Sequence, residues 1–76
     1  MSEPDTTKDL LGREVWVGAV VAGARFGRYP DLVTGPVLRI TPSGAVRIRV
    51  EVGSGGLRPA PGDELLLQPG LFVLLG

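Results

Sequence analysis

The side chains best suited to chemistry in this sequence are its arginines. Residues 15–58 hold six arginines, no lysine and only two acids, so this stretch carries a formal charge of +4. The planar guanidinium group donates hydrogen bonds in a fixed fork that matches phosphate and carboxylate groups. Arginine used without lysine therefore favours recognition of anions, although genome composition produces the same preference. The six residues are Arg25, Arg28, Arg39, Arg47, Arg49 and Arg58.

The residues that usually perform catalysis are missing. The chain contains no histidine and no cysteine, which removes the commonest general base and the strongest nucleophile. The neighbouring acids Asp63 and Glu64 would point to opposite faces of a strand, which is a poor arrangement for a carboxylate pair or a metal site. We therefore expect no enzyme activity, and no metal, cofactor or small-molecule substrate.

A second group of candidate residues lies in the first predicted loop. Arg25 and Arg28 alternate there with Phe26 and Tyr29, and such rings stack on bases while the guanidinium groups bind phosphates. The same residue types are common hot spots of protein interfaces. Phe26 is alternatively a plug for the end of the domain, and Trp16 is either a similar cap or an exposed anchor.

Glycine and proline interrupt the sequence every few residues and leave no helical stripe longer than one or two turns. Between these breaks, short segments rich in β-branched residues alternate as strands do. Seventy-six residues suffice for one domain. We expect residues 12–76 to form an all-β, five-stranded small barrel, after an acidic tail or short helical turn over residues 1–11. The predicted strands are 14–22, 33–41, 45–52, 63–68 and 71–75, with a ten-residue loop at 23–32.

The clearest predicted hairpin surrounds residues 41–44, where Pro42 and Gly44 suit a type I turn followed by a left-handed residue. Placing Thr41 opposite Ala45 fixes the register of the two strands. Opposite residues share a face of the sheet, so the apolar residues near the turn point inward. The predicted pairs are Ile40 with Val46, Arg39 with Arg47, Leu38 with Ile48, and Val37 with Arg49, and the inward residues are Ile40, Val46, Leu38, Ile48 and Val50.

The same register turns Arg39, Arg47 and Arg49 outward, beside Glu51. Like charges opposite each other are mildly unfavourable, by roughly 0.2 to 1 kcal/mol. Either Glu51 and the acidic N-terminus relieve this repulsion within the chain, or a polyanionic partner does.

The C-terminus is strongly apolar. Eight of the eleven residues 65–75 are apolar. They do not alternate with polar residues, as they would in a strand with one solvent-exposed face. A domain this small does not easily cover both faces, so we expect an assembly interface with a copy of the chain or with another protein. The alternative is that the N-terminal segment with Leu10 and Leu11 covers it. The interface candidates are Leu71, Phe72, Val73, Leu74 and Leu75.

Composition also bears on location. No apolar run approaches the roughly 20 residues needed to cross a bilayer. The acidic residues 1–11 do not have the character of a secretion signal, and the lack of cysteine fits a reducing compartment. We therefore expect a cytoplasmic protein without a membrane span.

One stretch carries a family resemblance. Gly35-Pro36-Val37-Leu38-Arg39-Ile40, a turn with Gly44, and Val46-Arg47-Ile48-Arg49-Val50 together resemble the KOW motif of SH3-like barrels in ribosomal and transcription-elongation proteins. This resemblance implies an SH3-like fold. It also implies contact with RNA or with the transcription or translation machinery through Arg25, Arg28 and Arg39.

Two functions remain open at this point. The first is a small non-catalytic binding module that contacts nucleic acid or an acidic protein surface through the strand arginines, the first loop and Trp16. The second is a structural or assembly subunit, within an oligomer, a larger complex or a virus particle, that uses its apolar C-terminal hairpin.

Overall fold

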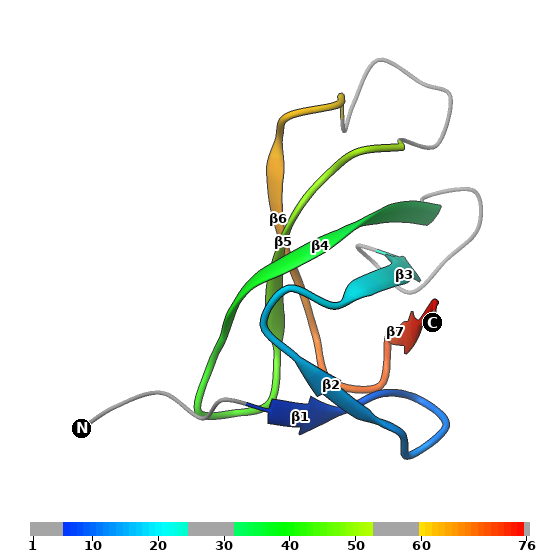
Figure 1. Ribbon diagram of the computed structural model, residues 1–76, viewed down its shortest axis with the longest axis vertical. Coiled ribbons are helices and arrows are strands. Elements are labelled where there is room, and N and C mark those ends of the chain that lie inside the picture. Colours follow the sequence, from blue (N-terminus) through cyan, green and yellow to red (C-terminus); the bar gives the residue numbers. More distant parts are fainter. Residues whose placement is uncertain (1–5, 25–31, 53–59, 76) are drawn as a thin grey trace.

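The computed structural model describes residues 6–24, 32–52 and 60–75, and every regular element among them is a strand (Figure 1). The predicted all-β class is therefore confirmed. The described residues form seven strands where five were expected. They are β1 (Thr6–Lys8), β2 (Glu14–Trp16), β3 (Val20–Ala24), β4 (Leu32–Ile40), β5 (Val46–Arg49), β6 (Glu64–Leu67) and β7 (Phe72–Leu74).

Five of the strands form one antiparallel sheet in the order β6-β5-β4-β3-β7, and β1 and β2 form a separate hairpin. The long strand β4 serves both halves of the sheet, because Leu32 to Pro36 pair with β3 and Val37 to Ile40 pair with β5. The last strand, β7, returns to pair with β3, the first strand of this sheet. Within the described residues β6 and β7 are the two edges, so the sheet does not close as a barrel.

The prediction of a tail or helical turn was wrong for residues 6–11. Thr6 to Lys8 form β1, which pairs with β2, and the chain then turns back through Gly12 at a φ of +80°. A single helical turn is unstable on its own, and β-branched threonines favour a strand. The hairpin crosses the lower end of the sheet in Figure 1, where Thr7 Oγ1 donates a 2.9 Å hydrogen bond to the carbonyl of Gly44.

The predicted strand 14–22 is divided in two. β2 ends at Trp16, a turn follows with Gly18 at a φ of +96°, and β3 begins at Val20. Val17, which strict alternation would place on the inner face, is therefore 50% exposed in the turn.

The β4–β5 hairpin follows the predicted register near its turn and departs from it farther away. Gly44 has the expected positive φ of +93°, and Arg39 lies opposite Arg47. A bulge between Val37 and Arg39 then shifts the register, so that Val37 lies opposite Ile48. Leu38 is consequently 36% exposed, and Val37 takes the predicted place of Leu38 in the core. The predicted pairs Leu38 with Ile48 and Val37 with Arg49 were wrong.

The core fills the space between the inner face of the sheet and the β1–β2 hairpin. It contains one residue of the hairpin, Val15, and side chains from every strand of the large sheet. The most deeply buried are Val15, Val21, Val33, Val37, Ile40, Val46, Ile48, Val50, Leu67 and Phe72.

Candidate protein interface

The outer surface of β7, β3 and β4 is apolar. Side chains alternate along a strand, so every second one points away from the core. Pairing and backbone hydrogen bonds align these outward residues in three rows across the strands. We call the nine residues the apolar face: Leu75, Val20 and Pro36 in the first row; Val73, Ala22 and Thr34 in the middle row; Leu71, Ala24 and Leu32 in the last row.

The apolar face carries a groove as well as exposed side chains. A groove of about 380 Å³ lies at the end that carries the last row, and its lining includes Leu10, Ala24, Leu32 and Leu71. Every described residue of its lining is apolar or glycine. Side chains are exposed at both ends, since Val20 is 41% and Leu75 is 53% exposed in the first row and Leu32 is 47% exposed in the last row.

This face is suited to hydrophobic association with another molecule. Among the described residues, the groove lining contains no acid, base or nucleophile. Removing apolar surface from water is favourable by roughly 25 cal/mol per Å². Contiguous exposed apolar surface of this kind marks an interaction site more often than isolated exposed residues do.

The C-terminal residues predicted as an assembly interface are divided between two surfaces. Phe72 is buried in the core, and Leu74 packs against the core from its edge. Leu71, Val73 and Leu75 lie on the apolar face. Residues 71–75 do not alternate between apolar and polar because both faces of this strand are apolar: one faces the core and the other belongs to the apolar face.

Sequence reasoning missed the contribution of β3 and β4 to this face. The side chains of Val20, Ala22 and Ala24 are small, and they form a continuous surface with Leu32 only when the three strands pair. One signal was available, because residues 17–24 contain no polar side chain.

The N-terminal segment protects the apolar C-terminus differently from the alternative in which Leu10 and Leu11 cover it. The side chains of both residues are exposed, and Leu10 only lines the groove. Instead the backbone of the β1–β2 turn protects the outer edge of β7, because Leu10 N–H donates a 2.9 Å hydrogen bond to the carbonyl of Phe72.

An ion pair between buried Asp9 and half-exposed Arg13 completes this edge, and we call these two residues the clasp. The Asp9 carboxylate accepts hydrogen bonds from the backbone N–H of Leu74 at 2.9 Å and from Arg13 Nε at 2.9 Å. A second guanidinium nitrogen of Arg13 donates to the carbonyl of Leu74 at 2.7 Å. The clasp thereby satisfies edge groups of β7 that would otherwise invite pairing with another strand.

The hydrogen bonds also set the acidity of Asp9. Burial by itself raises the pKa of this carboxyl, but hydrogen bonds from Leu74, Arg13 and Leu11 outweigh burial and lower the pKa from 3.8 to about 2. The clasp is therefore ionised at neutral pH.

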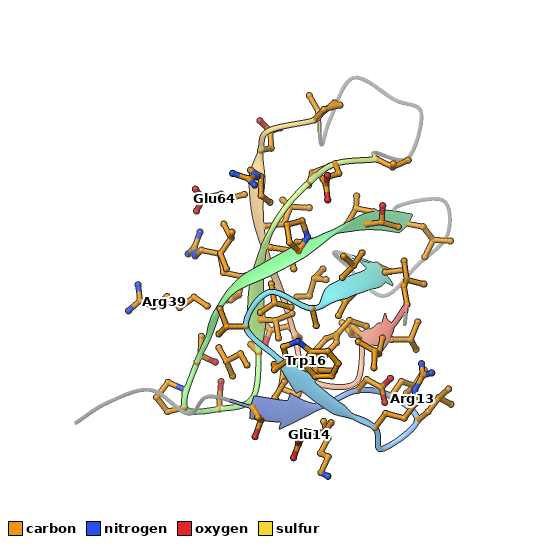
Figure 2. The ribbon with its side chains drawn as sticks, in the orientation of Figure 1. Arg13, Glu14, Trp16, Arg39 and Glu64 are labelled. Carbon is orange, nitrogen blue, oxygen red and sulfur yellow. The ribbon has the colours of Figure 1, made fainter. Side chains whose placement is uncertain are left out.

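The arginines of β4 and β5 form a second surface, which we call the arginine face. Arg39, Arg47 and Arg49 are all exposed. The acid placed among them is Glu64 of β6, which lies opposite Arg49 and 3.8 Å from Arg47. Figure 2 shows Arg39 and Glu64 projecting from the same side of the molecule. Exposed Leu38 and Leu66 make this surface partly apolar.

The remaining predicted site residues are Trp16 and those of the first predicted loop. Trp16 lies on the N-terminal hairpin and is 46% exposed (Figure 2), which is intermediate between a cap and a free anchor. Arg25, Arg28 and Tyr29, together with Phe26, lie outside the described residues.

Comparisons with known proteins give no relative to argue from: no family model, curated protein or solved structure matches this chain. Among the described residues there is no helix long and apolar enough to span a membrane.

Proposed function

We propose that this protein is a small, non-catalytic assembly module that binds another protein chain through its apolar face. The observation that carries this proposal is the composition of the face, which joins three strands and has Thr34 as its single polar member. The groove beside Ala24 adds a concave site that an apolar side chain of a partner would fill.

The connectivity of the sheet supports an SH3-like assignment within this proposal. Its order β6-β5-β4-β3-β7 places the last strand beside the first, with a long central strand shared by both halves. The KOW-type resemblance, mainly of residues 35–52, implies an SH3-like fold as well. Small folds of this type host many binding functions, so the surface chemistry must identify the partner.

The clasp is a reason to expect a partner on the apolar face and not along the edge of β7. Asp9 and Arg13 occupy both backbone groups of Leu74, so a partner meets a protected edge there. The apolar side chains of the same strand remain available on the outer surface, where Leu75 is exposed.

Site-specific photocrosslinking tests this proposal. A photoreactive amino acid is placed at Val20, on the apolar face, and in a matched variant at Arg49, on the arginine face. We expect discrete protein adducts in the native cell from position 20 and none of the same mass from position 49. Absence of adducts at position 20, or identical adducts at both positions, would refute a docking role for the apolar face.

A second candidate function rests on the arginine face. Three exposed arginines from two adjacent strands lie together, and Glu64 contacts one of them, Arg47, at 3.8 Å between half-exposed side chains. Surface pairs of this kind contribute little, about 0 to 1 kcal/mol. The face therefore retains positive charge suited to an anionic polymer such as nucleic acid.

A further inference from the structure

The two edges of the sheet differ in how their outward backbone groups are satisfied. At β7 the N-terminal hairpin bonds them, because Leu10 N–H donates to the carbonyl of Phe72 at 2.9 Å and the clasp bonds both groups of Leu74. The other edge strand, β6, pairs with β5 alone. Among the described strands, β6 is therefore the place where the sheet can still be extended.

The register fixes which backbone groups of β6 face outward. Val50 N–H donates a 2.7 Å hydrogen bond to the carbonyl of Asp63, so every second residue from Asp63 onward points its backbone groups at β5. The N–H and C=O groups of Glu64 and Leu66 point the other way. Within the described residues these outward groups have no hydrogen-bond partner. They form an open row of donors and acceptors that repeats every two residues.

The side chains along this edge differ between the two surfaces of the sheet. Leu65 points into the core and is 8% exposed. On the outer surface the register aligns Arg39, Arg47 and Leu66 in one row across β4, β5 and β6. Arg47 reaches towards the edge, because its guanidinium lies 3.8 Å from the carboxylate of Glu64. A strand added at β6 thus meets an apolar inner side and a cationic outer side.

We propose that β6 binds an extended segment of a partner protein, which adds to the sheet as an antiparallel strand. An extended backbone presents donors and acceptors at the two-residue spacing of Glu64 and Leu66. One residue of the segment lies opposite each of them and exchanges two hydrogen bonds with it. The residue between these two lies beside Leu65, where an apolar side chain covers the part still exposed. This edge is distinct from the apolar face, so the inference goes beyond the function proposed above.

The charges around β6 select the kind of segment. The residue opposite Leu66 completes the row that contains Arg39 and Arg47. It lies about 9.6 Å from the backbone of Arg47, two strands away, which a glutamate and the guanidinium group span together. We therefore expect an acidic residue there and a neutral one opposite Glu64. A second copy of this chain fits less well, because pairing through β6 would join its arginine face to the first.

Hydrogen exchange of the full chain tests where the segment binds. The probe is a synthetic seven-residue peptide whose valines alternate with threonine, glutamate and threonine. With the peptide at about 1 mM, the amide of Leu66 should exchange at least about twofold more slowly, as a dissociation constant of about 1 mM or less requires. An unchanged rate would overturn the proposal. So would equal slowing by an oligonucleotide, or slowing in the chain alone as its concentration rises, which would assign the edge to nucleic acid or to a second copy.

Methylated peptides test the backbone hydrogen bonds without altering the protein. A methyl group on the glutamate nitrogen removes the N–H that donates to the carbonyl of Leu66. The matched peptide carries the methyl group on the next valine nitrogen, whose N–H points away from β6. In NMR titrations we expect the first to bind at least about fivefold more weakly and the second to change by less than about twofold. Equal affinities of the two would contradict strand addition.

Substitutions at Leu66 test the same contact from the protein side. Leu66→Pro removes the outward N–H and leaves the hydrogen bonds between β5 and β6 in place. Leu66→Ala keeps the N–H and is the matched control. We expect the proline variant to bind the unmethylated peptide at least about fivefold more weakly than the alanine variant does. Equal binding by the two variants would refute the pairing at residue 66.

A lysine in place of the peptide's glutamate tests the preference for an acid. We expect the lysine peptide to bind the unmodified chain at least about threefold more weakly, and the two peptides to bind Arg47→Gln about equally. If the unmodified chain does not distinguish the peptides, an acidic partner segment is wrong.

Discussion

The carboxylate of Asp9 accepts a 2.9 Å hydrogen bond from the backbone N–H of Leu74, a contact between residues 65 positions apart in the sequence. It fastens the N-terminal hairpin to β7, the strand that carries Val73 and flanks Leu75. The stability of the clasp and the integrity of the apolar face are therefore linked.

Asp9→Asn should destabilise the fold. Asparagine keeps the size of the side chain but replaces one acceptor oxygen by a donor, so it cannot accept all four hydrogen bonds from Leu11, Arg13 and Leu74. We expect the melting temperature to fall by at least about 5 °C. Glu14→Gln removes an exposed carboxylate of the same hairpin and is the control; a similar fall in both variants would contradict a special role for the clasp.

Acid should weaken the fold through the same residue. The pKa of Asp9 is about 2 in the folded chain against an ordinary 3.8, so folding favours the ionised form. Its contribution to stability is complete above the ordinary pKa, declines as the pH falls, and is lost below about pH 2. Urea unfolding of the unmodified chain and Asp9→Asn should show a difference that shrinks between about pH 4 and pH 2. A difference independent of pH in this window would contradict the assignment.

Local patterns in the sequence were sufficient to predict the central hairpin. Pro42 and Gly44 define its turn, and alternation places Ile40, Val46 and Ile48 in the core. These features depend on neighbours within a few residues, where backbone preference and burial agree.

Features that depend on distant pairing were not predictable in this way. The bulge that exposes Leu38 arises where β4 changes partner from β3 to β5. Gly35 and Pro36 just before it are residue types found at bulges, but they do not fix which residue is displaced. The strand Thr6–Lys8 is held by contacts with Gly44 and by the clasp to Leu74, both far along the chain. The apolar face was missed for the same reason, because it exists only when Val20, Ala22 and Ala24 lie between β4 and β7.

Binding of nucleic acid to the arginine face should weaken as the salt concentration rises. If Arg39, Arg47 and Arg49 each contact one phosphate, binding to an oligonucleotide should show a slope of about −2 to −3 in log K against log salt. Replacing all three by serine should abolish binding at low salt and leave the circular dichroism spectrum unchanged. Lys8→Ser removes an exposed cation from β1 and should have little effect. No binding by the unmodified chain at low salt would eliminate nucleic acid as a partner of this face.

The segment that follows β5 packs closely against β4 at Gly35, and a substitution there tests this packing. Glu51 N–H donates a 2.8 Å hydrogen bond to the carbonyl of Thr34, so the segment after β5 lies directly against β4 there. A Cβ atom at Gly35 would overlap the carbonyl oxygen of Arg49, which is backbone and has no room to rotate away. We therefore expect Gly35→Ala to lower the free energy of unfolding by at least about 3 kcal/mol.

Gly62→Ala is the matched control for this substitution. Gly62 has a φ of +95° and open space around it, so alanine there causes backbone strain of about 1 to 2 kcal/mol without a collision. Urea unfolding of both variants measures the difference. If Gly35→Ala is no more harmful than Gly62→Ala, the backbone of Arg49 does not pack on β4 as closely as the structure places it. If it is far more harmful, the backbone of Arg49 packs directly against β4 at Gly35, where only glycine leaves room for it.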